Sequence, residues 1–295
     1  MDAAEVVAEF DATIWTGPFS GDERKRAVAA LEGGRVVFLP RLPFELLPAE
    51  QAFRTDKTLD DSRKNISFDP KTGRCHGSGF EGERLAALTA MLGRFGRGAE
   101  SLVRELLPRY APALERARTS FRPAEIAGRS YTPRHDDKRL HVDAFPTRPM
   151  RGRRILRLFS NIAPDGVMRE WRVGEPFPDF AQKFLPRVKP MAPGQAWVMN
   201  LLGLTKGRRT PYDQIMLGLH DGGKLDAGYQ ANAPRAALSF PTGSTWMCFT
   251  DSVLHAALAG RCALEQTFHL PVEAMAEPDR SPLRVLERLS GRALV

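Results

Sequence analysis

The sequence predicts a mainly β protein with flanking helices, an α+β arrangement in which helices support a β-sandwich or barrel. Twenty-three prolines are spread through the 295 residues, which favours short strands and loops over a helical bundle. From about residue 127 onward, short apolar segments bounded by Pro and Gly follow one another, whereas helical periodicity is concentrated before that point. The hydrophobic (42%) and charged (26%) fractions are those of an ordinary folded domain.

The N-terminal part, residues 1–126, is predicted to be a helical and loop support region. A short buried strand is expected within 33–47, and the polar, turn-rich segment 60–80 is interpreted as an ordered loop or hairpin. Leucines at spacings of three and four then indicate two helices, which are 81–94 and 98–118.

The β core is predicted over 127–272, with a long polar insertion at about 203–231, and a C-terminal helix follows within 273–295. Because no repeat or low-complexity tract divides the chain, we expect residues 1–295 to form a single domain. The predicted core strands are 139–145, 153–162, 196–200, 236–240, 244–250 and 261–270.

Composition limits the possible partners and the compartment. The formal net charge of +8 suits an anionic partner, such as nucleic acid, an acidic membrane, or a phosphorylated or carboxylated substrate. Three widely spaced cysteines, Cys75, Cys248 and Cys262, form no disulfide framework and fit a reducing compartment. The acidic N-terminus does not resemble a signal peptide, and no run approaches ~18 apolar residues. We therefore expect a cytoplasmic protein.

The stretch RLHVDAFPTRP (139–149) places His141 and Asp143 two residues apart in a segment that alternates like a strand. Residues two apart on a strand point to the same face, so these two side chains could bind one metal ion. The alternative is a hydrogen bond between them at the end of a strand. His135 and Asp137 have the same spacing but lie in a run of charges without apolar alternation, so the first pair is favoured.

A third ligand is expected at His255, which follows the apolar segment 244–250 and a polar turn. Two histidines and one carboxylate form the facial triad that holds iron in non-haem Fe(II) oxygenases and leaves positions open for other ligands. The alternative for His255 is a histidine whose hydrogen bonds are satisfied within the core.

Four segments carry a family resemblance: HVDAFPTRPMRGRRILRLFSNI, WRVGEPF, YDQIMLGLHD and ALEQTFHLP. Together they resemble the Kdo 3-hydroxylase family of Fe(II)/2-oxoglutarate-dependent dioxygenases, over about residues 35–272. The resemblance implies a double-stranded β-helix (jelly-roll) core in a single catalytic domain. It also implies Fe(II), 2-oxoglutarate and O2, and hydroxylation at C3 of a Kdo sugar in a Kdo–lipid A precursor of lipopolysaccharide, with succinate and CO2 as co-products. Iron would be held by His141, Asp143 and His255.

The distal carboxylate of 2-oxoglutarate needs a buried cation, for which Arg is well suited. Arg261 begins the strand after His255 and is one candidate, although six residues is a shorter separation than this class usually shows. Arg157 is the rival and shares its strand face with Asn161; both could bind the oxo acid or the substrate, or that face could be an exposed edge. Tyr131, ten residues before His141, could lie near the oxo acid or be a core tyrosine.

The anionic sugar and lipid predict basic residues near the mouth of the site, at 62–65, Arg134, Lys138 and 148–154. The C-terminal helix carries Arg every four residues beside a leucine stripe. It could touch the anionic inner face of the inner membrane, or simply pack against the core.

Three alternatives to this function are kept. The same chemistry could act on a nucleic acid or a protein, although the insertion lacks the Arg/Lys density and interleaved aromatics of a nucleic-acid groove, so no nucleic-acid partner is expected. A cupin-like binding module without catalysis and a zinc-dependent isomerase or hydrolase are the others.

Overall fold

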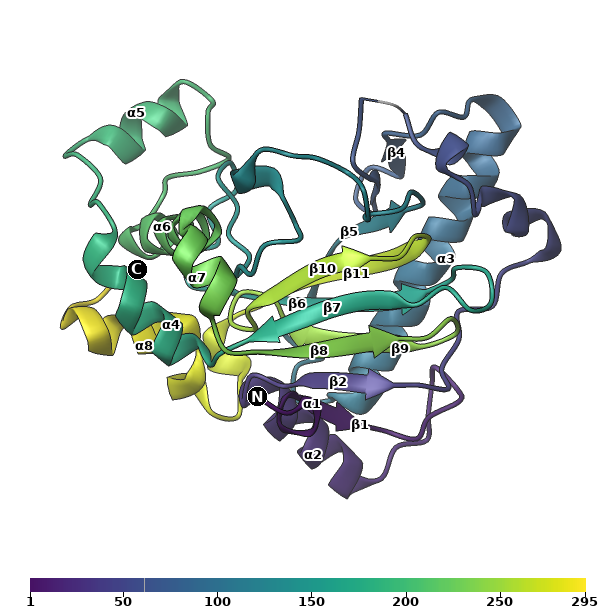
Figure 1. Ribbon diagram of the computed structural model, residues 1–295, viewed down its shortest axis with the longest axis horizontal. Helices are drawn as coiled ribbons and strands as arrows, with labels where there is room; N and C mark the ends of the chain where they lie inside the picture. Colours follow the sequence, from purple (N-terminus) through teal and green to yellow (C-terminus); the bar gives the residue numbers. More distant parts are fainter. Residues whose placement is uncertain (61) are drawn as a thin grey trace.

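The computed structural model describes residues 1–60 and 62–295, and two packed β-sheets form its centre (Figure 1). The larger sheet has eight strands in the order β1-β2-β9-β6-β11-β5-β3-β4, and the smaller has three in the order β10-β7-β8. The predicted fold class, a jelly-roll-like β core with flanking helices, is confirmed. The strands are β1 (Val7–Glu9), β2 (Val36–Leu39), β3 (Ile66–Asp69), β4 (Arg74–His76), β5 (Glu115–Arg122), β6 (Arg154–Asn161), β7 (Arg169–Gly174), β8 (Arg235–Phe240), β9 (Thr245–Phe249), β10 (His255–Ala259) and β11 (Ala263–Leu270).

The helices cover the outside of this sandwich. Helix α3 runs behind the larger sheet, and α4 to α8 gather at one end, on the left of Figure 1. Among the described residues, no helix is both long and apolar enough to cross a bilayer. The helices are α1 (Ala3–Val6), α2 (Gly21–Glu32), α3 (Gly82–Leu106), α4 (Phe177–Phe184), α5 (Gln195–Leu201), α6 (Pro211–Leu225), α7 (Ala227–Asn232) and α8 (Pro282–Ser290).

The alternation of side chains along β6 produces two separate apolar layers. Leu156 and Leu158 point outward into the core cluster shared with α3. Phe159 points inward, where it packs with Trp171 of β7 and Trp246 of β9 between the sheets. Helix α3 lies close to the larger sheet at Gly96, since a Cβ there would come within 2.8 Å of polar side-chain atoms on β5 and β11.

Helix α3 replaces the two helices predicted at 81–94 and 98–118. It is continuous to Leu106 and ends before Pro108, which cannot donate a backbone hydrogen bond. The last residues of the predicted second helix instead enter β5, whose sequence ERARTSFR has too little apolar alternation to be recognised as a strand.

Two other predicted strands are corrected. Residues 196–200 lie in helix α5, because a short apolar run does not by itself distinguish a helix from a strand. The segment 139–145 is extended but makes only an isolated bridge, at His141. The polar insertion at about 203–231 contains α6 and α7. Strands β7 and β10 were not predicted.

The predicted division at residue 126 does not coincide with an edge of the β core. Strands β1 to β5 all precede it, yet they belong to the larger sheet. The hairpin expected within 60–80 is present as β3 and β4, which pair in antiparallel fashion; Asp61 of that segment lies outside the described residues.

Candidate active site

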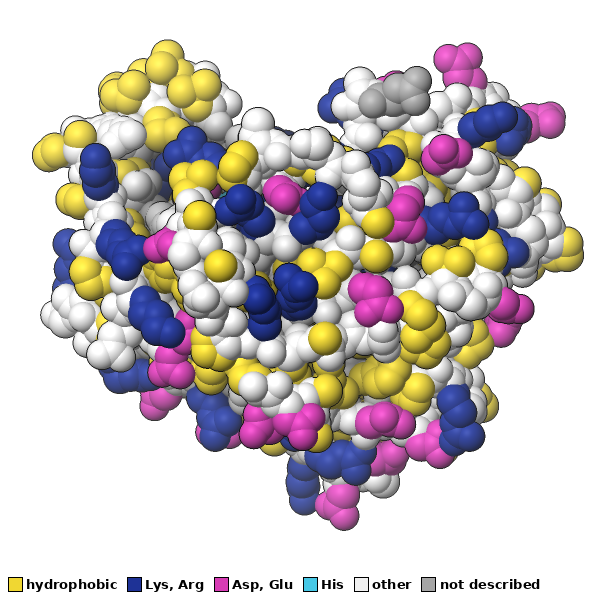
Figure 2. Space-filling model, in the orientation of Figure 1, with side chains coloured by type: hydrophobic (Ala, Val, Ile, Leu, Met, Phe, Trp, Pro, Cys, Tyr) yellow, Lys and Arg dark blue, Asp and Glu magenta, His cyan; other side chains and the backbone are white. Residues whose placement is uncertain are grey.

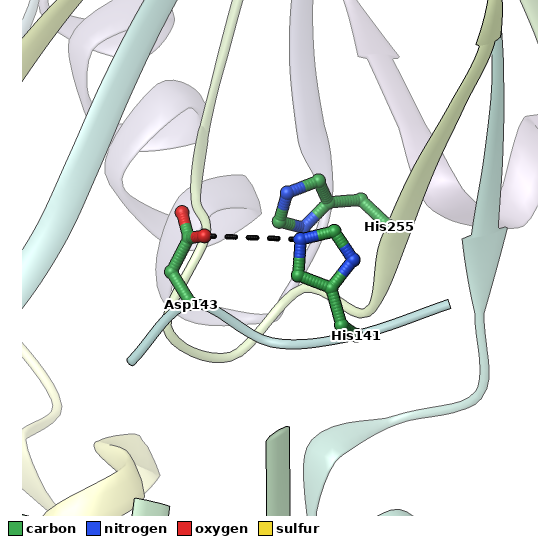
Figure 3. A group of neighbouring side chains, drawn as sticks. All are labelled: His141, Asp143 and His255. Atoms are coloured by element: carbon green, nitrogen blue, oxygen red, sulfur yellow. Dashed lines mark ion pairs between the residues drawn. The ribbon is translucent and has the colours of Figure 1, made fainter. Parts of the chain in front are cut away.

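His141, Asp143 and His255 meet at one end of the space between the sheets (Figure 3). His141 exchanges two backbone hydrogen bonds with His255, the first residue of β10, at N···O distances of 3.1 and 2.9 Å. The amide of Asp143 donates to the carbonyl of Thr250 at 2.7 Å. One potential ligand atom from each side chain lies within 4.8 Å of the other two, so backbone pairing brings the predicted triad together.

The imidazole rings are oriented for metal binding. Nδ1 of His141 lies 2.7 Å from the carbonyl oxygen of Arg139, and Nδ1 of His255 lies 2.9 Å from that of Val253. A carbonyl oxygen only accepts, so each Nδ1 carries the proton and each Nε2 keeps a free lone pair. Burial lowers the pKa of both histidines below the ordinary value, which keeps them neutral near pH 7.

Asp143 completes a donor set that fits a divalent transition metal. Burial alone would raise its pKa, but the nearby Arg157 and the two histidines outweigh that effect and hold the pKa well below the usual range. The carboxylate is therefore ionised beside two neutral imidazoles, which is the ligand chemistry of a facial triad.

A line of ion pairs runs from Asp143 across the larger sheet. Arg157 Nε lies 3.2 Å from Asp143 Oδ2, and Arg157 Nη1 lies 3.3 Å from Glu265 Oε1. Glu265 also pairs with Arg122, with Nη2 and Oε2 3.2 Å apart. Each of these groups compensates the burial of its neighbours, so the guanidinium of Arg157 is held between two carboxylates.

The same line continues toward α6 through Asp137. Arg122 Nη1 lies 3.5 Å from Asp137 Oδ2, and Lys224 Nζ lies 3.6 Å from Asp137 Oδ1. We refer to the whole line as the charge chain, whose members in order are Asp143, Arg157, Glu265, Arg122, Asp137 and Lys224.

The triad and the charge chain line a cavity of about 460 Å³. Arg169 of β7 also lines it, is only 3% exposed, and donates one hydrogen bond, to the carbonyl of Gly260 at 2.8 Å. Among the described residues it forms no ion pair, and burial lowers the pKa of this guanidinium to about 9. Trp171, two residues away on the same face, stacks on His255 with ring centroids 5.4 Å apart. Arg169 is thus a buried cation available to an incoming anion.

The structure places the four predicted co-substrate residues in different surroundings. Arg157 lines the cavity but is already paired with two carboxylates. Tyr131 lies at the cavity mouth, with the ammonium of Lys64 3.9 Å from its ring centroid. Asn161 is buried outside the cavity lining, where its side-chain amide donates to the carbonyls of Val167 and Phe240.

Arg261 is exposed and does not line the cavity, so the prediction that it holds the oxo acid is corrected. Gly260 and Cys262 both have positive φ, at 99° and 55°, and β11 begins only at Ala263. Arg261 therefore lies outside the strand that was predicted over 261–270, because the backbone is not extended through Cys262.

Sequence reasoning missed Arg169, Lys224 and His220, all of which line the cavity. Arg169, Trp171 and Val173 alternate within a single strand, the same mixture of Arg and apolar residues that drew attention to Arg157. Lys224 and His220 were hidden inside the predicted insertion. Of the basic residues expected at the mouth, Lys64, Arg134 and Lys138 line the cavity, whereas Arg148 and Arg153 lie in a separate pocket beside His269.

Comparisons with known proteins agree with this geometry. A family model described as 3-deoxy-D-manno-oct-2-ulosonic acid (Kdo) hydroxylase matches residues 15–293. The chain belongs to the Kdo hydroxylase family. A search of curated proteins found no match.

Solved structures of the Kdo hydroxylase KdoO are similar to this member of the family. One, described as a non-heme Fe(II) alphaketoglutarate dependent dioxygenase in complex with alphaketoglutarate and Fe(III), has 46% identity and a TM-score of 0.94. Another, in complex with cobalt(II), has 46% identity and a TM-score of 0.96. Each match covers 98% of this chain and 97% of the other.

Proposed function

We propose that this Kdo hydroxylase family member is an Fe(II)/2-oxoglutarate/O2-dependent hydroxylase that acts at C3 of a Kdo sugar in Kdo–lipid A. Its products would be the 3-hydroxylated sugar, succinate and CO2. The observation that carries the proposal is the convergence of His141, Asp143 and His255, with free Nε2 atoms and an ionised carboxylate, inside the cavity of a chain from this family. Bound Fe(II) would supply the redox chemistry that consumes O2 and 2-oxoglutarate.

In this proposal the protein orients the reactants and keeps water away. The two Nε2 atoms and one oxygen of Asp143 would hold the metal, while Arg157 fixes the other oxygen of that carboxylate. Arg169 is the cation assigned to the distal carboxylate of 2-oxoglutarate, because it is buried, lines the cavity and has no carboxylate partner among the described residues. Tyr131 lines the same cavity and is available to contact the substrate.

The test incubates the protein with Fe(II), 2-oxoglutarate, ascorbate and Kdo–lipid A under air and follows the product by mass spectrometry. Wild type should gain one oxygen atom, and His141→Ala and Asp143→Ala should not. A wild type that adds no oxygen, or ligand variants as active as wild type, would overturn the proposal. Succinate formed only in the presence of oxygen excludes a zinc isomerase or hydrolase.

A lipid-linked substrate also leads us to propose peripheral contact with the anionic inner face of the inner membrane, from the cytoplasm. The C-terminal helix is a poor candidate for that contact, since Leu283 and Leu286 of α8 are buried against the body of the protein. Helix α5 is a better one. It stands out from the body and is covered with hydrophobic side chains at the upper left of Figure 2. The exposed residues on it and in the turn after it are Trp197, Val198, Leu201, Leu202 and Leu204.

Charge around α5 favours a bilayer with anionic headgroups. The sequence from Lys183 to Arg209 contains six lysines and arginines and no Asp or Glu. Lys189, Lys206 and Arg208 are exposed on either side of the helix. Apolar side chains flanked by cations are the composition of an interfacial anchor.

Vesicle binding tests this contact without any turnover. Wild type should sediment with vesicles containing phosphatidylglycerol and less with neutral vesicles, and Leu201→Ser with Leu202→Ser should release it. Ile14→Ser is the matched control, because Ile14 is 58% exposed far from α5 in the sequence. Equal binding by the α5 variant, or self-association through α5 in place of vesicle binding, would refute the contact.

A further inference from the structure

Lys224 is the end of the charge chain that lies on helix α6 and lines the cavity. Every other member contacts two charged groups or is placed to bind the metal, whereas among the described residues Lys224 pairs with Asp137 alone, at 3.6 Å. Its ammonium donates one hydrogen bond, to the carbonyl of Arg134 at 3.3 Å. An ammonium has three protons to donate, so the described groups do not use all the hydrogen-bond donors of Lys224.

Because Lys224 is buried, its unused donors have little access to water. The residue is 2% exposed, and burial lowers its pKa below the ordinary value despite the nearby Asp137. A buried cation with few partners is stabilised when an anion binds to it. Lys224 is also close enough to the triad for its charge to influence His141 and His255.

Two buried cations at different places in the cavity have hydrogen-bond donors left for anionic ligands. The charge chain alternates three carboxylates with three cations and is neutral as a whole. Arg169 stands outside it as an additional positive charge at the β7 side. Arg122 and Arg157 are held between carboxylates. Among the described residues that line the cavity, Arg169 and Lys224 are therefore the buried cations with hydrogen-bond donors left.

Helix α6 carries Lys224 on one cavity-facing stripe. Leu217, His220 and Lys224 are spaced by three and four residues, and all three line the cavity. The ring of His220 lies edge-on to that of His141, with centroids 5.5 Å apart. The stripe therefore extends from the triad to the end of the charge chain.

The chemistry of the sugar fits this position. The family's substrate is a 3-deoxy-oct-2-ulosonic acid, so its carboxylate is C1 and C2 separates it from C3. If C3 is placed near the triad, the carboxylate is held within a few ångströms of the triad as well. A cation there must be distinct from the one that binds 2-oxoglutarate.

We infer that Lys224 binds the carboxylate of the sugar substrate. The two anionic ligands are then bound by different cations of the cavity, the sugar by Lys224 and 2-oxoglutarate by Arg169. This inference deepens the proposed function and rests on it. Helix α6 then determines specificity for an acidic sugar, while β7 determines the use of the oxo acid.

Direct binding to the Co(II)-loaded protein without oxygen tests the assignment. Lys224→Gln should weaken binding of free Kdo by tenfold or more, about the effect of losing a charged hydrogen bond, and leave 2-oxoglutarate affinity within about twofold. Arg169→Gln should do the reverse. Lys224→Arg should recover part of the Kdo affinity. Retained 2-oxoglutarate binding shows that the Lys224 variants are folded, and retained Kdo binding shows the same for Arg169→Gln.

A Kdo analogue with a carboxamide at C1 identifies which group Lys224 recognises. Wild type should bind the acid more tightly than the amide, by about the same factor by which Lys224→Gln weakens Kdo binding. Lys224→Gln should bind the acid and the amide with equal affinity. A variant that weakens acid and amide equally, or that weakens 2-oxoglutarate in parallel, overturns the inference. If wild type adds no oxygen to Kdo–lipid A, the proposed function itself fails; if wild type does so and Lys224→Gln binds Kdo as well as wild type does, only this inference fails.

Discussion

The two faces of the larger sheet use the same strands for different purposes. On the outer face, Leu158 of β6 and Leu264 of β11 are fully buried in the cluster shared with α3. On the inner face, Arg157 and Glu265 of these same strands form ion pairs beside the triad. Burial stabilises the first set, whereas the second is costly to bury and is kept in place by its partners. Residues that stabilise the fold therefore alternate with residues of the site along the same strand.

The largest effect is expected from His255→Ala. It removes one metal ligand and should abolish hydroxylation, but the apo-protein should stay folded because the site is an open one rather than a structural metal centre. Product mass spectrometry and thermal unfolding of the apo-protein check both parts. An apo-protein that unfolds on mild warming and is rescued by zinc alone would indicate a structural metal instead.

Leu264→Ala on the outer face should have the opposite effect: the protein should lose stability but keep its hydroxylation activity. Truncating a fully buried leucine costs about 2–5 kcal/mol of the free energy of unfolding. Denaturant titration measures the loss, with Leu289→Ala as a control because Leu289 is 41% exposed. Turnover in the cold, where the variant is folded, should be unchanged; a loss of activity there would break the separation between the faces.

Histidine burial should make the apo-protein sensitive to mild acid. The pKa of His269 is lowered to about 4, first by burial and then by Arg153. In the unfolded chain this histidine has a pKa near 6.5. Between that pH and about 4 the unfolded chain therefore binds a proton that the folded chain does not bind. The free energy of unfolding falls as the pH drops through this window. His269→Gln should reduce the slope of unfolding free energy against pH, leaving a remainder from His141 and His255. An unchanged slope would contradict the prediction.

The smallest effect is expected from Glu265→Gln. Without this carboxylate, Arg157 loses one of its two anchors and holds Asp143 less firmly. Co(II) affinity, measured by titration, should fall by about 10–100-fold, as for other groups that orient a metal ligand. Leu264→Ala is the matched control on the same strand and should leave Co(II) affinity unaltered. Equal losses in the two variants would show that the effect is one of general destabilisation.

Alternation along a strand explains how much of the site could be predicted. It identified Arg157 as a candidate for the site, and because β6 is regular there, Arg157 does line the cavity and is not at an exposed edge. It failed for Arg261, where a positive φ at Cys262 interrupts the extended backbone. Local pattern contains no information about such a turn.

The triad was predicted for a reason that proved only partly right. His141 and Asp143 lie on an extended segment rather than in a regular strand, and pairing with His255 supplies the geometry that strand parity was expected to give. Lys224 could not be found in this way. Its role depends on the packing of α6 against the sheets, which joins residues more than eighty positions apart.

The stacking of Trp171 on His255 gives the protein an internal optical signal. An indole 5.4 Å from a ligating ring lies next to any ion bound there. Open-shell ions such as Co(II) or Fe(II) quench the emission of a neighbouring indole, whereas Zn(II) does so far less. Intrinsic fluorescence should therefore dim as the site fills with iron or cobalt, and occupancy could be followed in a cuvette without substrate, oxygen or product.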